Sequence, residues 1–144
     1  MKLEEAKQIA EKYIELNKCK YTEMEVVGSI RRQKAEVNDI DIIAIPVVPD
    51  KKKIIREMFM GAQIDLYIAT PFNFDVLKLI RTGSANHNKK LCFLALRNGW
   101  KLKANGEGLL LLTPNNAGAL ITITSERGIL EKLLGKYIEP EQRD

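Results

Sequence analysis

Cysteine, histidine and long hydrophobic runs are all scarce in this sequence of 144 residues. The two cysteines, Cys19 and Cys92, are not in a C-x-x-C spacing, and His87 is the only histidine. These residues are too few for the usual zinc ligand sets, and the thiols are expected to be reduced. No apolar run approaches the roughly twenty residues of a membrane span, and the first residues do not resemble a secretory signal. Composition therefore predicts a soluble, cytoplasmic, monomeric protein without a membrane partner, formed by one compact unit.

Acidic residues are absent from a long stretch in the second half of the chain. The net charge of +4 arises in residues 71–144, with eleven Lys and Arg against seven Asp and Glu, because residues 1–70 hold twelve of each. Between Val76 and Gly106 there are seven basic residues and no acidic one. A surface that follows phosphate groups has this pattern; a solubilising face, the alternative, usually mixes both signs. The candidate DNA contacts are Lys89, Lys90, Arg97, Lys101 and Lys103.

Three aspartates are the candidate chemical groups. Asp39 and Asp41 lie one residue apart in an Ile-rich strand pattern, so their side chains project to one face while Ile40 and Ile42 face the core. Asp65 follows in a second apolar segment. If the two segments pair, three carboxylates meet, and a hard divalent cation relieves their repulsion. The sequence therefore predicts a magnesium site whose two ions bridge the phosphates of a nucleotide.

A glycine-serine step precedes the aspartates. The apolar segment before Gly28 and Ser29 predicts a strand that ends where backbone amides can approach an anion closely. Arg32 adds a guanidinium that can bind a phosphate through two hydrogen bonds. Together with the carboxylates, this pattern favours a nucleotidyltransferase active site over an unrelated structural cluster, although Asp-x-Asp alone is a weak signal.

The order and spacing of these motifs resemble the palm and thumb of family X DNA polymerases. The resemblance rests on Gly28-Ser29-Ile30-Arg31-Arg32, Asn38-Asp39-Ile40-Asp41, Ile64-Asp65-Leu66, Thr82-Gly83-Ser84 with His87-Asn88, and Tyr137-Ile138-Glu139-Pro140-Glu141-Gln142-Arg143. Minimal nucleotidyltransferases of other kinds share only the first two motifs. The resemblance implies an α+β fold: a nucleotidyltransferase (polymerase beta-like) palm with a mixed sheet, residues 1–70, and a small helical thumb with a β-hairpin, residues 71–144.

The resemblance also implies roles for the matching residues. Asp39 and Asp41 would bind two Mg²⁺ ions, for which Mn²⁺ is a substitute, and Asp65 would bind the catalytic ion and help take the proton from the primer. The implied nucleotide contacts are Gly28, Ser29, Arg32, Asn38, Thr82, Gly83, Ser84 and Asn88. Lys89 would reach toward the template base, and the Gly83–Ser84 peptide is expected to be cis.

Several positions depart from the family pattern. Ile80 and Arg81 stand where many relatives have an aromatic pair against the sugar, so the choice between deoxyribose and ribose stays open. Gln63 replaces an arginine two residues before the third aspartate, and Cys92 replaces a basic contact to the template. Low fidelity is therefore expected.

The leading functional hypothesis is a DNA-directed DNA polymerase that adds deoxynucleotides to a primer 3′-hydroxyl in gap-filling repair synthesis. Its partners would be gapped or primer-template DNA and nucleoside triphosphates. Two alternatives stay open. One is template-independent transfer of a nucleotide to a nucleic-acid or protein acceptor, and the other is a non-catalytic nucleic-acid-binding module.

The hydrophobic periodicity predicts the order of helices and strands. Helices are expected at residues 3–16, 50–60, 70–81, 84–98 and 125–134, and strands at residues 24–28, 39–46 and 62–69. A short helix or turn should follow Ser29, and residues 100–112 should form a hairpin with its turn at Asn105-Gly106. His87 is expected on a helix surface and Trp100 in the core.

Overall fold

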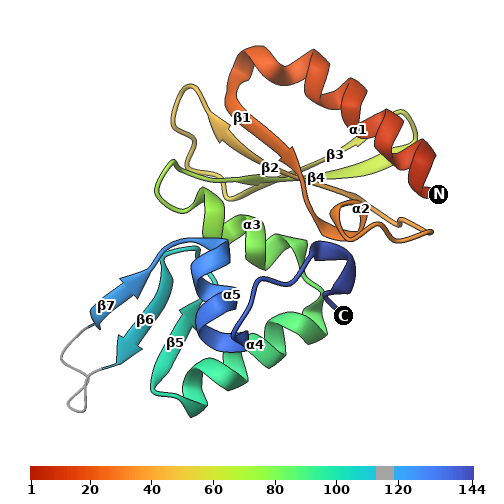
Figure 1. Ribbon diagram of the computed structural model, residues 1–144. Coiled ribbons are helices and arrows are strands. Elements are labelled where there is room, and N and C mark those ends of the chain that lie inside the picture. Colours follow the sequence, from red (N-terminus) through yellow and green to blue (C-terminus); the bar gives the residue numbers. More distant parts are fainter. Residues whose placement is uncertain (113–118) are drawn as a thin grey trace.

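The computed structural model describes residues 1–112 and 119–144, which form two lobes lying side by side (Figure 1). The first lobe is a four-stranded sheet in the order β1-β2-β4-β3, with β2 and β4 parallel and both outer pairs antiparallel. Its elements are α1 (Leu3–Asn17), η1 (Lys18–Lys20), β1 (Tyr21–Val26), α2 (Gly28–Arg31), β2 (Ile40–Pro46), β3 (Ile54–Phe59) and β4 (Ala62–Ile68). The sheet is therefore mixed, as expected.

Strand alternation divides the sheet into two faces with different neighbours. On one face, Ile42 of β2 and Leu66 of β4 pack with the buried side of α1, which presents Ile9 and Tyr13. The opposite face begins with the carboxylates of Asp41 and Asp65 and continues with apolar residues. The apolar part is covered by the second lobe, through a cluster of Val27, Ile43, Ala69 and Leu77. This arrangement leaves the carboxylate end of the face at the junction of the lobes.

The second lobe packs three helices against a small antiparallel sheet. Its elements are α3 (Phe74–Thr82), α4 (Ala85–Arg97), β5 (Trp100–Lys103), β6 (Gly108–Leu112), β7 (Ala119–Ile123), α5 (Glu126–Leu134) and η2 (Pro140–Gln142). Leu79, Leu91, Trp100 and Ile129 are among the buried residues of its core. The hydroxyl of Ser84 caps α4 by accepting a hydrogen bond from the His87 amide, which confirms the predicted start of this helix.

The helix predicted at residues 50–60 is wrong, because this segment forms the edge strand β3. Phe59 aligns with Ala62, so β3 and β4 are joined by the two residues Met60 and Gly61, whose φ angles of 50° and 78° are both positive. Such a turn matches the twist of a hairpin. Ile55 and Phe59 pack beside the α1 core, and this packing together with the pairing to β4 outweighs the local helix signal.

Three further expectations need correction. The third helix begins at Phe74, after a turn in which the Thr70 carbonyl accepts from the Phe74 amide, and not at residue 70. A strand, β7, follows the predicted hairpin and was not expected. His87 is buried rather than on the surface, and burial lowers its pKa to about 4, with a further decrease from the positive charges of Arg143 and Lys90.

The α+β class with a mixed sheet is confirmed. The division into residues 1–70 and 71–144 stays a prediction, and residues 113–118 of the second part lie outside the described residues. Within the described part of the chain, every helix is too short or too polar to cross a membrane.

Candidate active site

The sheet register places two of the three predicted aspartates side by side. Asp41 of β2 is aligned with Asp65 of the parallel neighbour β4, so both side chains project from the same face. Asp39 lies two residues before Asp41, just ahead of the first residue of β2. Asp65 is 7% exposed, whereas Asp39 and Asp41 are partly exposed. The three carboxylates therefore lie at one end of the two central strands, at the junction of the sheet with the second lobe.

The electrostatics of Asp41 show that these carboxylates affect one another. Burial raises its pKa from 3.8 to about 6, and the neighbouring charges of Asp65 and Asp39 contribute to this rise. The hydrogen bond from Tyr67 and the positive charge of Arg32 act in the opposite direction and are outweighed. A bound cation stabilises the charged form of carboxylates that are buried and repel one another in this way.

The donor set fits a hard divalent cation, because all three side chains offer carboxylate oxygens. Among residues 1–112 and 119–144, no three His, Cys, Asp or Glu side chains already form a compact ligand cluster. The alignment of Asp41 with Asp65 and the raised pKa of Asp41 are the observations that make these residues candidate ligands.

Glycine is required at position 28 by the closeness of Asp41. Gly28 has a φ of +63°, and a Cβ atom placed on it would lie 2.1 Å from Oδ2 of Asp41. The residue before Gly28 is fixed to the same strand, because the Val27 amide donates to the Asp41 carbonyl over 2.8 Å. The glycine-serine step and the aspartate pair therefore share one rigid corner of the sheet.

A cavity of about 700 Å³ lies between the two lobes and collects most of the predicted site residues. Those from the first lobe are Gly28, Ser29, Arg32, Asn38, Asp39 and Asp41, and those from the second are Gly83, Ser84 and Asn88. Tyr67, Ile80, Arg81 and Ala85 also line it. Asp65 lies beside the cavity, next to Asp41.

The second lobe also matches a known protein family. Residues 78–144 match the family model described as DNA polymerase beta thumb. The whole chain is similar in structure to polymerase beta of Leishmania infantum, solved as a ternary P/T complex, with a TM-score of 0.73 and 17% sequence identity. The match covers 100% of this chain and 76% of that chain. The chain therefore has the fold of polymerase beta, and its second lobe matches the thumb of that family; the corresponding first lobe is referred to below as the palm. No curated protein sequence matches it.

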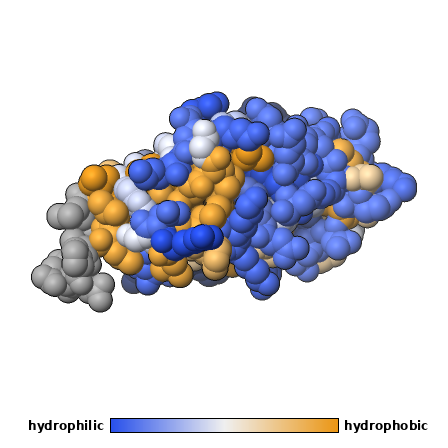
Figure 2. Space-filling view, turned by 60° about the horizontal axis from the view of Figure 1, so that its bottom comes forward, coloured by the Kyte–Doolittle hydropathy of each residue, from blue (hydrophilic) through white to orange (hydrophobic). Residues whose placement is uncertain are grey.

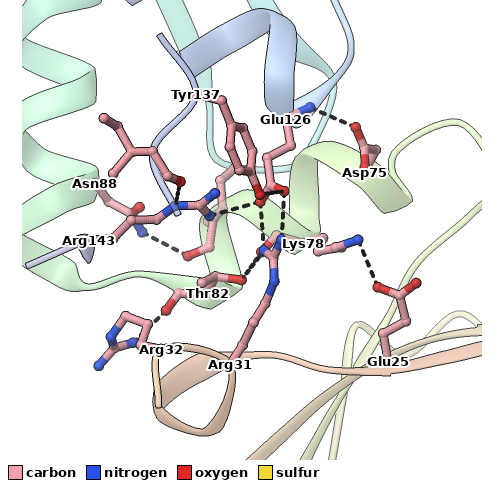
Figure 3. Close-up of polar contacts among 12 residues, drawn as sticks. Glu25, Arg31, Arg32, Asp75, Lys78, Thr82, Asn88, Glu126, Tyr137 and Arg143 are labelled. Atoms are coloured by element: carbon pink, nitrogen blue, oxygen red, sulfur yellow. Dashed lines mark hydrogen bonds and ion pairs between the residues drawn. The ribbon is translucent and has the colours of Figure 1, made fainter. Parts of the chain in front are cut away.

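The turn that enters the thumb is held by the palm. Thr82, a predicted nucleotide contact, is fully buried and does not line the cavity; its hydroxyl accepts from Arg31 over 2.7 Å and donates to the Lys78 carbonyl over 2.6 Å (Figure 3). Its carbonyl accepts a hydrogen bond from Arg32. The Gly83–Ser84 peptide that follows is cis, as the resemblance implied. Thr82 thus shapes the site by fixing this turn.

A buried ion network, missed in the sequence, joins palm and thumb. Both terminal nitrogens of Arg31 in the palm donate to the carboxylate of Glu126 in the thumb, each over 2.7 Å. Arg143, which is fully buried, donates to the same carboxylate over 2.9 Å (Figure 3). A second bridge between the lobes, from Lys78 to Glu25, measures 2.9 Å. The wall of the cavity formed by the thumb is therefore tied to the palm by charge-assisted contacts.

Two residues next to the aspartates were also missed. Arg56 of β3 is aligned with Asp65, and its Nε lies 3.3 Å from Oδ1 of that carboxylate. Oδ1 also accepts a hydrogen bond from Gln63 over 3.0 Å. Tyr67 donates to Oδ1 of Asp41 over 3.3 Å. The spacing of two between Asp65 and Tyr67 could have indicated their shared face, whereas Arg56 was hidden by the wrong helix prediction.

Tyr67 supplies an aromatic ring close to Ile80 and Arg81, the two positions where many relatives have an aromatic pair. The guanidinium of Arg81 lies 4.3 Å from the centroid of the Tyr67 ring. Both residues line the cavity, so a strand residue of the palm brings an aromatic group close to the position where the family pattern predicts one from the thumb.

The predicted DNA contacts lie outside the cavity. Lys89, Lys90 and Arg97 are exposed on α4, while Lys101 and Lys103 follow on β5. Their assignment to DNA stays a prediction.

Proposed function

We propose that the protein is a magnesium-dependent DNA polymerase of family X, which adds deoxynucleotides to a primer 3′-hydroxyl in gap-filling synthesis. The alignment of Asp41 with Asp65 beside Gly28 supports this proposal most directly, because it combines cation ligands with a close backbone approach for phosphates. The polymerase from Leishmania infantum was solved as a ternary P/T complex, which supports DNA as the partner.

The palm residues bind and orient the reacting groups. Divalent cations held by Asp39, Asp41 and Asp65 would neutralise the charge that develops on the phosphates. Arg56 and Gln63 both engage Oδ1 of Asp65, so Oδ2 is the oxygen that would receive the proton of the primer hydroxyl. Ser29 contributes its amide and hydroxyl to the terminal phosphates, at the corner where Gly28 leaves space.

Among the polar atoms of cavity-lining residues that have no hydrogen-bond partner within the described residues, two fit a bound nucleotide. The Nε atom of Arg32 is one of them, although another nitrogen of the same guanidinium holds the Thr82 carbonyl. The other is Oδ1 of Asn88, whose amide nitrogen donates to the Ile80 carbonyl over 2.8 Å. Arg32 would bind phosphate oxygens while it fixes the turn, and Asn88 would accept from the base.

Primer extension tests the proposal. The purified protein should extend a gapped primer-template with the deoxynucleotide complementary to the template base, in a reaction that needs Mg²⁺ or Mn²⁺. Asp65→Asn should lose extension on every substrate, because the substituted residue no longer supplies a carboxylate. Addition that ignores the template base would favour a template-independent transferase. DNA binding without nucleotide binding or extension would favour a non-catalytic module.

Arg56→Gln is expected to lower kcat roughly tenfold and to change the KM for the nucleotide little. The reason is that Arg56 contacts Asp65 and none of the residues proposed to hold the nucleotide. Steady-state extension kinetics give both constants. Arg56→Lys should recover part of the rate, and Lys52→Gln, an exposed change before the same strand, should have no effect. Unchanged kcat in Arg56→Gln would remove Arg56 from the site.

A further inference from the structure

A groove lies at the end of the palm sheet that is remote from the aspartates. It has a volume of about 290 Å³ and lies between the loop after β2 and the loop after β4, which Figure 1 shows at the left of the palm, away from α2. Pro46 follows Asp41 by five residues along β2, a separation of about 17 Å at ~3.3 Å per residue. Among the described residues, none lines both this groove and the cavity between the lobes. We refer to it as the loop groove, and its apolar floor is formed by Ile45, Pro46, Pro49, Ile68, Ala69 and Pro71.

Hydrogen bonds hold the loop groove in shape. The Ile68 amide donates to the Lys53 carbonyl over 2.9 Å, so the end of β4 is tied to the end of the first loop. In the second loop, the Thr70 amide donates to the side-chain oxygen of Asn73 over 2.7 Å. A ligand would therefore meet a groove that is already formed, which lowers the entropy lost on binding.

The rim of the loop groove is basic. Lys51, Lys52 and Lys53 line it and are all exposed, and the ion pairs of residues 1–112 and 119–144 include none of them. A second hollow of about 370 Å³ adjoins the groove and adds Lys20. Asp50 is the only acidic residue among the described residues that line the two hollows. The groove therefore presents a positive potential around an apolar floor.

Large apolar side chains are exposed beside the groove. Val47, Val48 and Phe72 are 57%, 76% and 91% exposed, and each lies between residues that line the groove. Apolar surface gathered around a concavity is typical of a contact with another protein, whereas interfaces with DNA are more polar. A second copy of the chain is a poor occupant, because a symmetric contact would bring the lysines together. Charge complementarity instead favours an acidic partner.

We propose that the loop groove binds an extended acidic segment of a partner protein. Apolar side chains of the segment fill the floor and contact Val48 and Phe72, while its carboxylates pair with the lysines of the rim. An extended chain suits this surface, because its successive side chains point in opposite directions and can serve the floor and the rim in turn. The inference goes beyond the proposed polymerase chemistry, since a partner in the loop groove leaves the cavity open.

The test uses a fluorescein-labelled peptide of about ten residues, in which Asp alternates with Leu and Phe, and measures its binding by fluorescence anisotropy. Lys51→Glu combined with Lys53→Glu should weaken binding at least about tenfold, and Val48→Ser combined with Phe72→Ser should do the same. Two altered peptides test the same contacts without changing the protein. One has Asn in place of each Asp, the other has Ser in place of each Leu and Phe, and both should bind at least about tenfold more weakly.

The thumb provides matched controls. Lys89→Glu combined with Lys90→Glu changes the charge by the same amount on α4. Phe93→Ser combined with Leu96→Ser removes two apolar side chains that are each 62% exposed. Figure 2, in which the bottom of Figure 1 is turned forward, shows hydrophobic surface gathered over the thumb end of the molecule, so this control tests whether any exposed apolar surface suffices. Both controls should bind the peptide as tightly as the unsubstituted protein.

Several results would overturn the inference. One is the absence of peptide binding, and another is equal weakening by the thumb controls, which would indicate unspecific attraction. Parallel titrations use single-stranded oligothymidine and phosphatidylserine vesicles. If either of these needs Lys51 and Lys53 more than the peptide does, the groove serves a nucleic acid or a membrane instead. So would sedimentation of a dimer that the Val48 and Phe72 changes dissociate, since the occupant would then be a second copy.

Asp65→Asn separates this inference from the proposed function. The variant should bind the peptide normally although it cannot extend a primer. If the unsubstituted protein binds the peptide through the loop groove but never extends a primer, the catalytic proposal fails and the docking site stands. If it extends primers and does not bind the peptide, the docking site fails and the catalytic proposal stands.

Discussion

Asp41→Asn is expected to abolish nucleotide transfer and, at the same time, to stabilise the metal-free protein at neutral pH. The loss of activity should reach at least about a thousandfold, because the change removes a carboxylate that is proposed to hold both cations. The gain in stability follows from the raised pKa of Asp41, about 6, which burial and the charge of Asp65 produce. An amide at this position carries no charge to repel, so the free energy of unfolding should rise by about 1–2 kcal/mol.

The pH dependence of this gain has a defined sign. Because the pKa of Asp41 is higher in the folded state than its ordinary 3.8, the folded protein binds an extra proton between about pH 3.8 and 6. The folded state therefore loses stability as the pH rises through this window, and the variant does not. The difference in Tm between the two proteins, measured in EDTA, should be largest above pH 6 and should shrink toward pH 4.

Asp50→Asn provides the control for both effects. Asp50 is exposed in the loop after β2, so this change should leave extension unaltered and should change the free energy of unfolding by no more than about 0.5 kcal/mol. Retained extension by Asp41→Asn would show that the chemistry does not depend on this carboxylate. A lower Tm at pH 7.5 would show that the interactions of Asp41 with Tyr67 and Arg32 outweigh the repulsion.

Glu126→Gln is expected to cost about 3–5 kcal/mol of folding stability. Glu126 is 5% exposed, and its carboxylate neutralises both Arg31 and the fully buried Arg143. Burial alone would raise its pKa, yet the hydrogen bond from Arg31 and the charge of Arg143 hold it below the usual range. The amide preserves the shape but leaves two guanidinium groups in the interior without a counter-charge. Urea denaturation followed by circular dichroism measures the loss.

Glu131→Gln, on the same helix, is the matched control. Glu131 is exposed and pairs with Arg127 at 3.5 Å across one helical turn, so its replacement should cost no more than about 0.5 kcal/mol. A similar cost for the two changes would show that the buried network does not stabilise the contact between palm and thumb. Because the network joins the lobes, Glu126→Gln should also weaken the cavity wall and reduce extension at temperatures where the protein is still folded.

Several elements could be predicted because their signals lie within a few residues. The alternation of Asp39 and Asp41 with isoleucines predicts a strand, and β2 begins at Ile40, between the two aspartates. Ser84 before a helical pattern predicts a cap, and its hydroxyl accepts from His87. The prediction of a helix at residues 50–60 was wrong for a physical reason: the strand that forms there depends on pairing with β4 and on burial beside α1. Because this strand was not predicted, the contact of Arg56 with Asp65 was not predicted either.

The sequence by itself determined which groups are available: three carboxylates at strand spacing, a glycine-serine step and a basic stretch without acids. Only the tertiary structure decided which of them meet. Asp41 aligns with Asp65 through a parallel pairing of strands that are not consecutive, and Arg31 meets Glu126 across 95 residues of chain. Local patterns cannot specify such contacts, because the first forms only when the sheet of the palm assembles and the second only when the two lobes pack together, and both close long loops.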